Sequence, residues 1–480
     1  MNRASAALLN NIMRLGPQYL PFADAATEEL PLGRLLRLSL FQVTVGMAAV
    51  LMIGTLNRVM IVELGVPSWI VALMLALPLL SAPLRTLIGF RSDHHRSVLG
   101  WRRVPFIWFG TMSQFGGFAI MPFALLILSG DTTGPLWVGD IAAALAFLLV
   151  GAGLHTVQTV GLALATDLAP ERARPKVVAL LCAMLLVGMA ASALIFGLLL
   201  RHFSEVRLIQ VVQGAAVVTM ALNSIALWKQ EPRNALPFAG ARRIRFRSAW
   251  EVFSRDGRTR RRLVAIALGT AGFSMQDILL EPYGGKILKL PVGATTTLTA
   301  MLAIGGGLGL WVAARRLNRG ADPHRIAGFG AVVGVIAFAF VMFAAPFNSG
   351  EIFGVGVGLI GLGGGLFAHG TLTASMAAAR PEDRGLALGA WGAAQATAAG
   401  LAIVLSGLIN DAGSALAMRG VFGEALADPV TGYTFVYALE ILLLLATVVA
   451  VGPLTRRSLA PAESPLAGAS QIRFNPGGLP

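Results

Sequence analysis

The chain has 480 residues, of which 56% are hydrophobic and only 13% are charged, and its mean hydropathy is +0.72. These values exclude a soluble globular domain and indicate an integral membrane protein. A net charge of +14 can signal nucleic-acid binding, but here the basic residues are spread over separate loops without a recognition motif. A nucleic-acid partner is therefore not expected.

Twelve apolar runs are long enough to cross a bilayer as helices. They cover approximately residues 36–62, 67–90, 104–128, 137–164, 177–200, 207–228, 263–283, 293–314, 326–345, 351–376, 385–409 and 433–454. The runs are rich in Gly and Ala and mostly free of charge, which favours helices over barrel strands. The predicted fold is an all-α membrane protein with twelve transmembrane helices.

The basic residues predict the orientation of these helices. Most of the 38 Lys and Arg residues precede the first run, follow the last run or lie in every second loop. The opposite loops hold only a few, namely Arg201, Arg207, Lys286, Lys289 and Arg419. The positive-inside rule therefore places both termini in the cytoplasm. Anionic lipids are expected to contact this basic face.

A basic stretch at 229–262 separates two groups of six runs. The sequence therefore predicts an N-terminal half at 36–228 and a C-terminal half at 263–455, joined by a cytoplasmic linker. Residues 1–35 and 456–480 are predicted to be cytoplasmic. The first of these segments carries apolar residues at helical spacing, which fits an interfacial helix. A disordered lead-in fits equally well.

The two halves resemble each other in sequence. GTLNRVMIVEL, from Gly54, matches GFSMQDILLEP, from Gly272, and a Pro-Glu pair follows the fourth and tenth runs at nearly the same offset. Duplicated six-helix halves are typical of major facilitator transporters. The sequence therefore predicts two pseudo-symmetric halves in a major facilitator fold.

The loop after the second run is similar to a loop motif of that superfamily. The matching residues are Gly89, Asp93, Gly100, Arg102 and Arg103. In the superfamily, the glycine allows close helix approach and the aspartate pairs with cationic groups to latch one conformation. Here three residues, 94–96, lengthen the loop, and its counterpart after the eighth run is degenerate. Both departures weaken the prediction of a latch.

Polar residues interrupt the first and seventh runs, where a charge costs about 2.5–3.5 kcal/mol at a helix centre. They are Asn57, Arg58, Gln276, Asp277 and Glu281. Symmetry places Arg58 and Asp277 at similar depth, so we predict that they pair and seal the outer end between the halves. Alternatively the group is a proton or substrate site, Glu281 reaches Lys286 or Lys289, or these residues are exposed at the surface.

Four strings in the chain are similar to one family. They are GLHTVQTVGLALATDLAPERARPKVVALLCAMLLVGM, GFSMQDILLEPYGGKIL, GATTTLTA and GLALGAWGAAQATAAG. They resemble the PucC/LhaA family, the bacteriochlorophyll delivery branch of the major facilitator superfamily, and the resemblance extends over residues 30–455. The family implies an assembly factor for light-harvesting antennae in the photosynthetic membrane. The N-terminal segment and the length are more similar to LhaA, tied to the core antenna LH1, than to PucC, tied to the peripheral antenna LH2.

The resemblance also implies partners and cofactors. The expected partners are the LH1 alpha and beta polypeptides, with bacteriochlorophyll synthase and a membrane insertase as further candidates. The expected cofactors are bacteriochlorophyll a and a carotenoid. The Mg of bacteriochlorophyll needs one axial ligand, and of the six histidines only His155 and His369 fall within predicted helices. We predict these two as ligands, with Gln158 as the next candidate; the alternative is that each imidazole only holds helix packing.

Glycines recur at helical spacing in the tenth run, at Gly354, Gly358, Gly361 and Gly365. Such spacing favours close helix packing, and a groove for a pigment tail is the alternative. The chain shows no metal-ligand spacing, nucleophile–base motif or phosphate loop, so an enzyme is not expected. The remaining alternative function is a secondary transporter that moves a small, mainly apolar molecule by alternating access.

Overall fold

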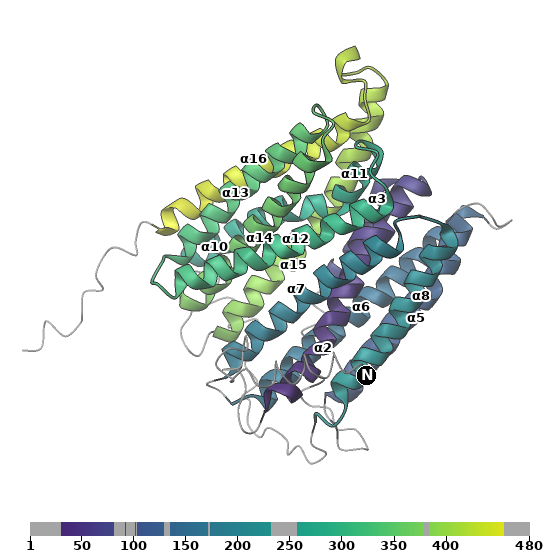
Figure 1. Ribbon diagram of the computed structural model, residues 1–480. Coiled ribbons are helices and arrows are strands. Elements are labelled where there is room, and N and C mark those ends of the chain that lie inside the picture. Colours follow the sequence, from purple (N-terminus) through teal and green to yellow (C-terminus); the bar gives the residue numbers. More distant parts are fainter. Residues whose placement is uncertain are drawn as a thin grey trace, which may run out of the picture.

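The computed structural model describes residues 30–80, 92, 101, 103–128, 135–170, 173–231, 257–378 and 384–455. Every regular element in these ranges is helical (Figure 1). Eleven helices are long and apolar enough to cross a membrane, and the shorter apolar helix α3 (Ser68–Leu80) stands at the second predicted run. The prediction of an all-helical, multi-pass membrane protein is therefore confirmed.

Six of the predicted runs precede the linker at 229–262. Their helices are α2 (Leu32–Ala49), which continues as η3 (Val50–Leu56) and η4 (Val59–Glu63), then α3, α5 (Val104–Leu128), α6 (Leu136–Leu168), α7 (Arg174–Leu199) and α8 (Glu205–Leu227). Six follow it. Their helices are α10 (Gly257–Ser274), which continues as η5 (Met275–Ile278) and α11 (Leu280–Lys286), then α12 (Val292–Leu317), α13 (Pro323–Ala344), α14 (Gly350–Ala378), α15 (Arg384–Met418) and α16 (Val430–Thr455); the short 3-10 turn η7 (Glu424–Leu426) precedes α16.

Local sequence sets where these helices begin and end. Ser204 and Asp322 cap α8 and α13, because their side chains accept hydrogen bonds from the first free backbone N–H groups. The chain leaves η4 through Gly65 and α12 through Gly320, with φ of +67° and +83°. Only glycine adopts such angles without steric cost, so these two residues allow the tight reversals between membrane helices.

Helices from before and after the linker pack directly against each other. α7 contacts α12, α3 contacts α15, and η3 contacts both α12 and η5 (Figure 1). Glycines allow the first two approaches: a Cβ on Gly293 would lie 2.5 Å from the Gly197 carbonyl oxygen, and one on Gly407 would lie 2.9 Å from the Ser68 carbonyl oxygen. Without a hydrophobic drive between helices in lipid, such close backbone packing holds the bundle together.

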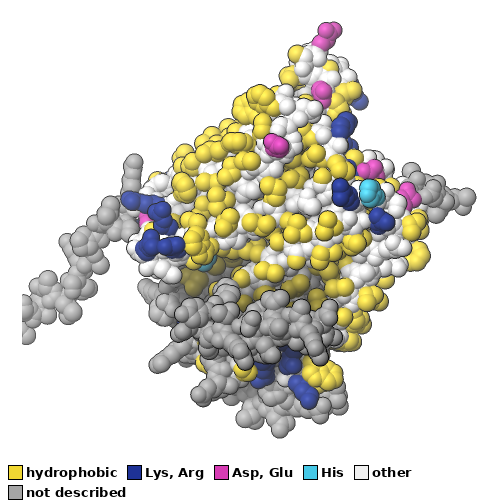
Figure 2. All heavy atoms as spheres, viewed as in Figure 1, with side chains coloured by type: hydrophobic (Ala, Val, Ile, Leu, Met, Phe, Trp, Pro, Cys, Tyr) yellow, Lys and Arg dark blue, Asp and Glu magenta, His cyan; other side chains and the backbone are white. Residues whose placement is uncertain are grey.

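The bundle has two ends, which we name by their residues. The terminal face holds the starts of α2 and α10 and the ends of α8 and α16, where Arg34 bonds Gln230 and the Arg261 guanidinium donates to the Ala450 carbonyl oxygen at 2.9 Å. The far face holds the ends of η4 and α11. Between these ends, hydrophobic side chains cover the visible surface, while basic and acidic ones gather toward the ends (Figure 2). Phe109, at 72% exposed, is one of many exposed large hydrophobic side chains, and such a surface suits contact with lipid.

Candidate functional site

The first membrane helix loses α-helical geometry in its far-face half. α2 ends at Ala49, and the segments Val50–Leu56 and Val59–Glu63 are both π-helical. Asn57 and Arg58 lie between these segments and are buried, with Arg58 only 4% exposed. Because π-helical turns are rare and occur frequently at functional sites, this irregularity marks the region as a candidate site.

The seventh membrane helix is interrupted at the same level. α10 ends at Ser274, Met275–Ile278 forms a 3-10 turn, and α11 begins at Leu280. The interrupted parts of the two helices contact each other, η3 with η5 and η4 with α11. Broken membrane helices free backbone groups for binding, and in transporters they form the substrate and ion sites.

Asn57 joins the two interruptions. Its side-chain amide donates hydrogen bonds to the carbonyl oxygens of Ile53 at 2.9 Å, of Asp277 at 3.3 Å and of Ile278 at 2.9 Å. Two of these carbonyl groups belong to the 3-10 turn of the seventh helix. A buried carbonyl without a partner is costly, so Asn57 stabilises the break by satisfying it.

The predicted ion pair between Arg58 and Asp277 is wrong. Arg58 Nη1 lies 2.5 Å from Oε1 of Glu63, and Arg58 Nη2 donates to the Leu290 carbonyl oxygen at 3.1 Å. The carboxylate of Asp277 instead accepts a hydrogen bond from the neighbouring Gln276 amide. The reason lies in the π-helical backbone, which aligns residues five apart on one side of the helix and so places Glu63 beside Arg58.

Glu281 lies next to Arg58 but bonds a different group. It is 3% exposed, and its Oε1 accepts a hydrogen bond of 2.6 Å from the Thr299 hydroxyl on α12. The Arg58 guanidinium is close enough to interact with it electrostatically. Among the described residues Glu281 pairs with neither Lys286 nor Lys289, the alternative that its sequence neighbours suggested.

Two glycines provide the space for these buried charges. A Cβ on Gly54 would lie 2.5 Å from Oε1 of Glu281, and a Cβ on Gly285 would lie 2.9 Å from Nε of Arg58. The motif EPYGG therefore has a local explanation: its glutamate bonds Thr299 on α12, and its last glycine leaves room for the Arg58 guanidinium. Gly54, which matches Gly272 in the sequence repeat, likewise lies where any side chain would collide with Glu281.

Sequence reasoning missed Glu440 on α16. This residue is 0% exposed, and neither carboxylate oxygen has a hydrogen bond of normal geometry among the described residues. The Gln276 backbone and the Asp277 carboxylate lie nearby, and Gly272 packs against the Glu440 carbonyl oxygen. The available signal was an acidic residue within the otherwise apolar run 433–454, which is unusual enough in a membrane helix to indicate function.

Two tyrosines lie on the same side of α16 as Glu440. Tyr433, Tyr437 and Glu440 are spaced i, i+4 and i+7, which places them in one stripe along the helix. Both tyrosine hydroxyls are buried without a hydrogen-bond partner among the described residues. The ring of Tyr283, on α11, packs against both at centroid distances of 5.5 and 5.4 Å. The stripe therefore extends the polar region from the seventh helix along α16.

The predicted pigment ligands lie elsewhere, in the half of the bundle nearer the terminal face. His155 and Gln158 on α6 and His369 on α14 are all half-buried. α6 and α14 share no extended packing contact, so the structure does not bring the two histidines together along a common interface. An imidazole nitrogen is a suitable axial ligand for Mg, so the donor chemistry of both residues fits a bacteriochlorophyll.

The glycines beside these histidines do not provide a flat pocket. A Cβ on Gly153 would lie 2.5 Å from the Gly110 carbonyl oxygen of α5, and one on Gly370 would lie 2.8 Å from the Pro323 carbonyl oxygen of α13. Neighbouring helices therefore occupy the space that the sequence suggested for a macrocycle. Gly364 is looser, with its closest neighbour, Phe273, at 3.8 Å.

The glycine string of the tenth run divides in the same way. On Gly361 and Gly365 a Cβ would lie 2.1 Å from the Leu302 carbonyl oxygen and 2.4 Å from the Gly306 carbonyl oxygen, so both residues pack against the backbone of α12. Gly354 has only ordinary contacts, and the Cβ position of Gly358 is open. Close packing thus accounts for two of the four glycines.

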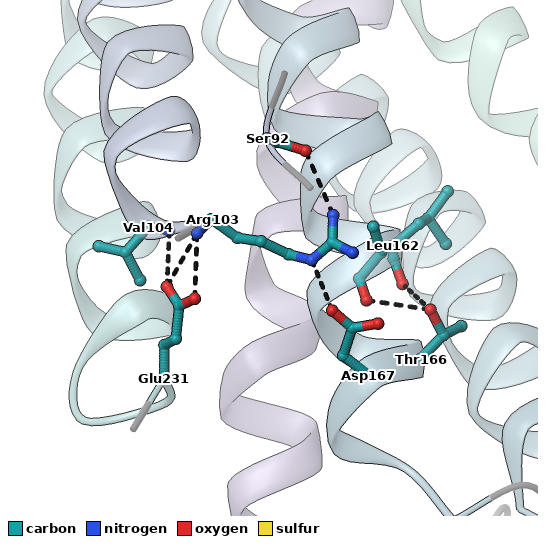
Figure 3. Close-up of polar contacts among 8 residues, drawn as sticks. Ser92, Arg103, Val104, Leu162, Thr166, Asp167 and Glu231 are labelled. Carbon is teal, nitrogen blue, oxygen red and sulfur yellow. Dashed lines mark hydrogen bonds and ion pairs between the residues drawn. The ribbon is translucent and has the colours of Figure 1, made fainter. Parts of the chain in front are cut away.

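A second polar network lies at the terminal face (Figure 3). Arg103 Nε lies 2.6 Å from Oδ2 of Asp167 at the end of α6, and Arg103 Nη1 donates to the Ser92 hydroxyl at 3.2 Å. The Glu231 carboxylate accepts from the backbone N–H groups of Arg103 and Val104 at 2.9–3.0 Å and so caps α5. Of the predicted loop motif, only Arg103 can be placed; Gly89, Asp93, Gly100 and Arg102 lie outside the described residues.

Comparison with known proteins connects this architecture to a family. The family model described as PUCC protein matches residues 55–459, which is most of the chain. The chain belongs to the PUCC protein family. Protein PucC of Rhodovulum sulfidophilum is 57% identical over 419 residues, covering 86% of this chain and 92% of that protein.

A second relative and a solved structure extend the comparison. A Rhodobacter capsulatus protein described as an uncharacterized protein in the puhA-bchM intergenic region is 52% identical over 461 residues, covering 95% of this chain and 96% of that protein. A bacterial homologue of the lysosomal transporter Spinster, crystallised in an inward-facing conformation, matches with a TM-score of 0.65 at 14% identity, covering 87% of this chain and 95% of that one. This PucC-family chain therefore has a fold like that of major facilitator transporters.

The site of this PucC-family chain consists of buried acidic side chains and one buried arginine. Among the described residues no three His, Cys, Asp or Glu side chains converge as metal ligands. Arg58 and Glu63 form one ion pair, Glu281 bonds a hydroxyl, and Asp277 and Glu440 are carboxyl groups without a cationic partner in the described part of the chain. Such an arrangement can bind protons or bias the packing of the two broken helices.

Proposed function

We propose that the chain is an assembly factor for a bacterial light-harvesting antenna. It binds antenna polypeptides, bacteriochlorophyll or both, and aids their union in the membrane. The observation that carries the proposal is membership of the PucC family, at 57% identity to a protein named PucC. In the family that the sequence motifs resemble, this role belongs to a major facilitator fold that acts without enzymatic chemistry.

The topology of this proposal has two six-helix halves in a photosynthetic inner membrane, with both termini in the cytoplasm. The distribution of Lys and Arg supports this orientation. The contacts of α7 with α12 and of α3 with α15 support two packed halves, because they join helices from before and after the linker at 229–262. The terminal face would then be cytoplasmic and would contact anionic lipids.

The proposed client is LH1 rather than LH2. This preference rests on the N-terminal segment and on the overall length, which are more similar to LhaA members. The exposed apolar belt offers the alpha and beta polypeptides a lipid-facing surface on which a transmembrane helix can dock. Bacteriochlorophyll synthase and a membrane insertase would act beside the chain, supplying the pigment and the new polypeptides.

For the pigment, His155 and His369 are the proposed Mg ligands, with Gln158 next. Their donor atoms support bacteriochlorophyll a binding, and all three side chains are half-buried. The carotenoid would lie along α14 beside Gly354 and Gly358, since a Cβ at Gly354 would make only ordinary contacts and the Cβ position of Gly358 is open. When bound, the pigment would provide the light-absorbing macrocycle. The chain would hold this macrocycle and exclude water from it.

A transporter of a small apolar molecule is the second candidate. The observation that favours it is the interruption of the first and seventh helices at a buried polar cluster, a feature shared with transporters. The two candidates differ in what stays bound. An assembly factor retains antenna polypeptide or pigment through purification, whereas a transporter moves its substrate between compartments.

The test is purification of the full chain in mild detergent from cells that make LH1, followed by absorption spectroscopy and polypeptide analysis. We expect bacteriochlorophyll and LH1 polypeptides to copurify, and we expect His155→Ala or His369→Ala to lower the pigment content at least several-fold. His202→Ala, at an exposed position near the far face, is the matched control and should leave pigment unchanged. Absence of both pigment and polypeptide would overturn the proposal, while pigment retained in both variants would overturn only the ligand assignment.

A further inference from the structure

Among the described residues, Glu440 has no cationic partner although it is fully buried. It is 0% exposed and lies in α16, a helix that is otherwise apolar around it. Neither carboxylate oxygen has a hydrogen bond of normal geometry among the described residues. An ionised carboxylate in such a place would be strongly unfavourable, because burial removes its hydration and the nearby Gln276 backbone is the only polar group beside it that favours the charge among the described residues.

The elements that pack against α16 do not change this conclusion. α10, α13 and α15 contact it, and their charged or titratable residues in the described part of the chain lie near helix ends. These residues are Arg258, Arg260, Arg261, Arg262, His324, Arg325, Arg384 and Asp411. Asp411 faces Tyr433 rather than Glu440. Near Glu440 itself, the titratable groups are Asp277 from η5 and Tyr437 on α16.

Asp277 makes the ionised form of Glu440 still less favourable. The two carboxyl groups are close enough to interact electrostatically, and two like charges at one buried site cannot both be ionised at little cost. A metal ion would resolve the repulsion, but no third acidic or nitrogen ligand joins the pair among the described residues. A proton resolves it with the groups that are present.

We propose that Glu440 is a proton-binding residue of this chain and that Tyr433 and Tyr437 connect it to the far face. In the packed arrangement Glu440 is a neutral carboxylic acid, formed when its carboxylate takes one proton from water at that face. The two hydroxyls are buried and unpartnered among the described residues, and they stand one and two turns before Glu440 on the same stripe. From Tyr433 to Glu440 the stripe rises roughly 10 Å along the helix.

Proton binding has a structural consequence at the break in the seventh helix. α16 packs against η5, which carries Gln276 and Asp277, and α10 approaches α16 at Gly272, where a Cβ would lie 3.3 Å from the Glu440 carbonyl oxygen. A neutral Glu440 permits the contact of α16 with η5, whereas an ionised Glu440 repels Asp277 and favours separation of α16 from η5. Proton binding at Glu440 therefore biases the conformation of the broken seventh helix, whichever molecule the chain binds.

The test is infrared spectroscopy of the full-length protein, because the C=O stretch of a protonated carboxylic acid is separate from the amide bands. We expect the difference spectrum between wild type and Glu440→Gln to show one such band at neutral pH, with Glu440→Gln as thermostable as wild type. Tyr437→Phe should retain the band but slow its hydrogen–deuterium exchange several-fold. Glu351→Gln, at an exposed position on α14, is the control and should change neither.

A carboxylic acid band of the same intensity in wild type and Glu440→Gln would overturn the assignment. Unchanged exchange in Tyr437→Phe would overturn the tyrosine connection alone. If Glu440→Gln does not fold, Glu440→Asp supplies the test, since a protonated aspartic acid must give the band at a shifted frequency. Absence of the band in that folded variant would equally contradict the proposal.

Discussion

At the scale of single residues, the polar cluster depends on which partner each charged group finds. Arg58 is buried beside Glu63 and Glu281, and Gly285 leaves just enough room for its guanidinium. Because the π-helical backbone brings Glu63 to Arg58, Arg58 pairs with the residue five positions along the chain and not with Asp277 of the other repeat. The pairing therefore follows from local geometry.

This pairing makes a prediction about substitutions. Glu63→Gln should lower the free energy of unfolding by about 1.5–3 kcal/mol, since it removes a charged hydrogen-bond partner from buried Arg58. Asp277→Asn should cost less, because Asp277 bonds only the adjacent Gln276 side chain and lies near another acid. Thermal unfolding of both variants in detergent measures the order. A larger loss of stability in Asp277→Asn than in Glu63→Gln would contradict the Arg58–Glu63 pair and support the Arg58–Asp277 pair that the sequence suggested.

At the scale of helices, close backbone contact between α12 and α14 is the strongest packing feature of the glycine string. Gly361 and Gly365 lie against the α12 backbone, and Gly305 and Gly309 do the same from the other side. In lipid these contacts stabilise the pair by van der Waals packing. The helices therefore depend on the absence of side chains at particular positions.

Two glycines of α14 provide a matched pair for testing this packing. Gly361→Ala should destabilise the protein by about 1–3 kcal/mol, because its Cβ would overlap a backbone carbonyl that cannot move alone. Gly358→Ala, where the Cβ position is open, should be neutral or stabilising by up to about 1 kcal/mol. The melting temperatures of the two variants give the comparison. Equal destabilisation would show that α12 and α14 do not pack as described.

Much of this fold could be predicted from the sequence, because apolar length determines whether a segment can span a bilayer. The interruption at Met275–Ile278 could not, since it depends on Asn57 from another helix satisfying the freed carbonyl groups. The Arg58 partner was missed because the prediction followed the symmetry of the two repeats, whereas the π-helical backbone brings Glu63 to Arg58. Glu440 was missed because it lies outside the repeated motifs, although it is a single acid within the apolar run 433–454.

At the scale of the whole molecule, orientation in the membrane is the property that decides which face meets the cytoplasm. Cysteine labelling tests it, since the chain has a single cysteine, Cys182, that can be replaced by serine. In that background His202→Cys, on the far face, should react with an impermeant thiol reagent added to intact cells. Arg319→Cys, in the loop after α12, should react only after lysis. The reverse pattern would invert the proposed topology.

We propose that the chain assembles light-harvesting antennae. The most direct measurement is the LH1 absorption of photosynthetic membranes from a strain that lacks this chain, before and after the full-length gene is returned. We expect that LH1 absorption falls several-fold without the chain, while LH1 polypeptide transcripts persist, and that it returns with the wild-type gene. Unchanged LH1 absorption in the deletion strain would contradict it.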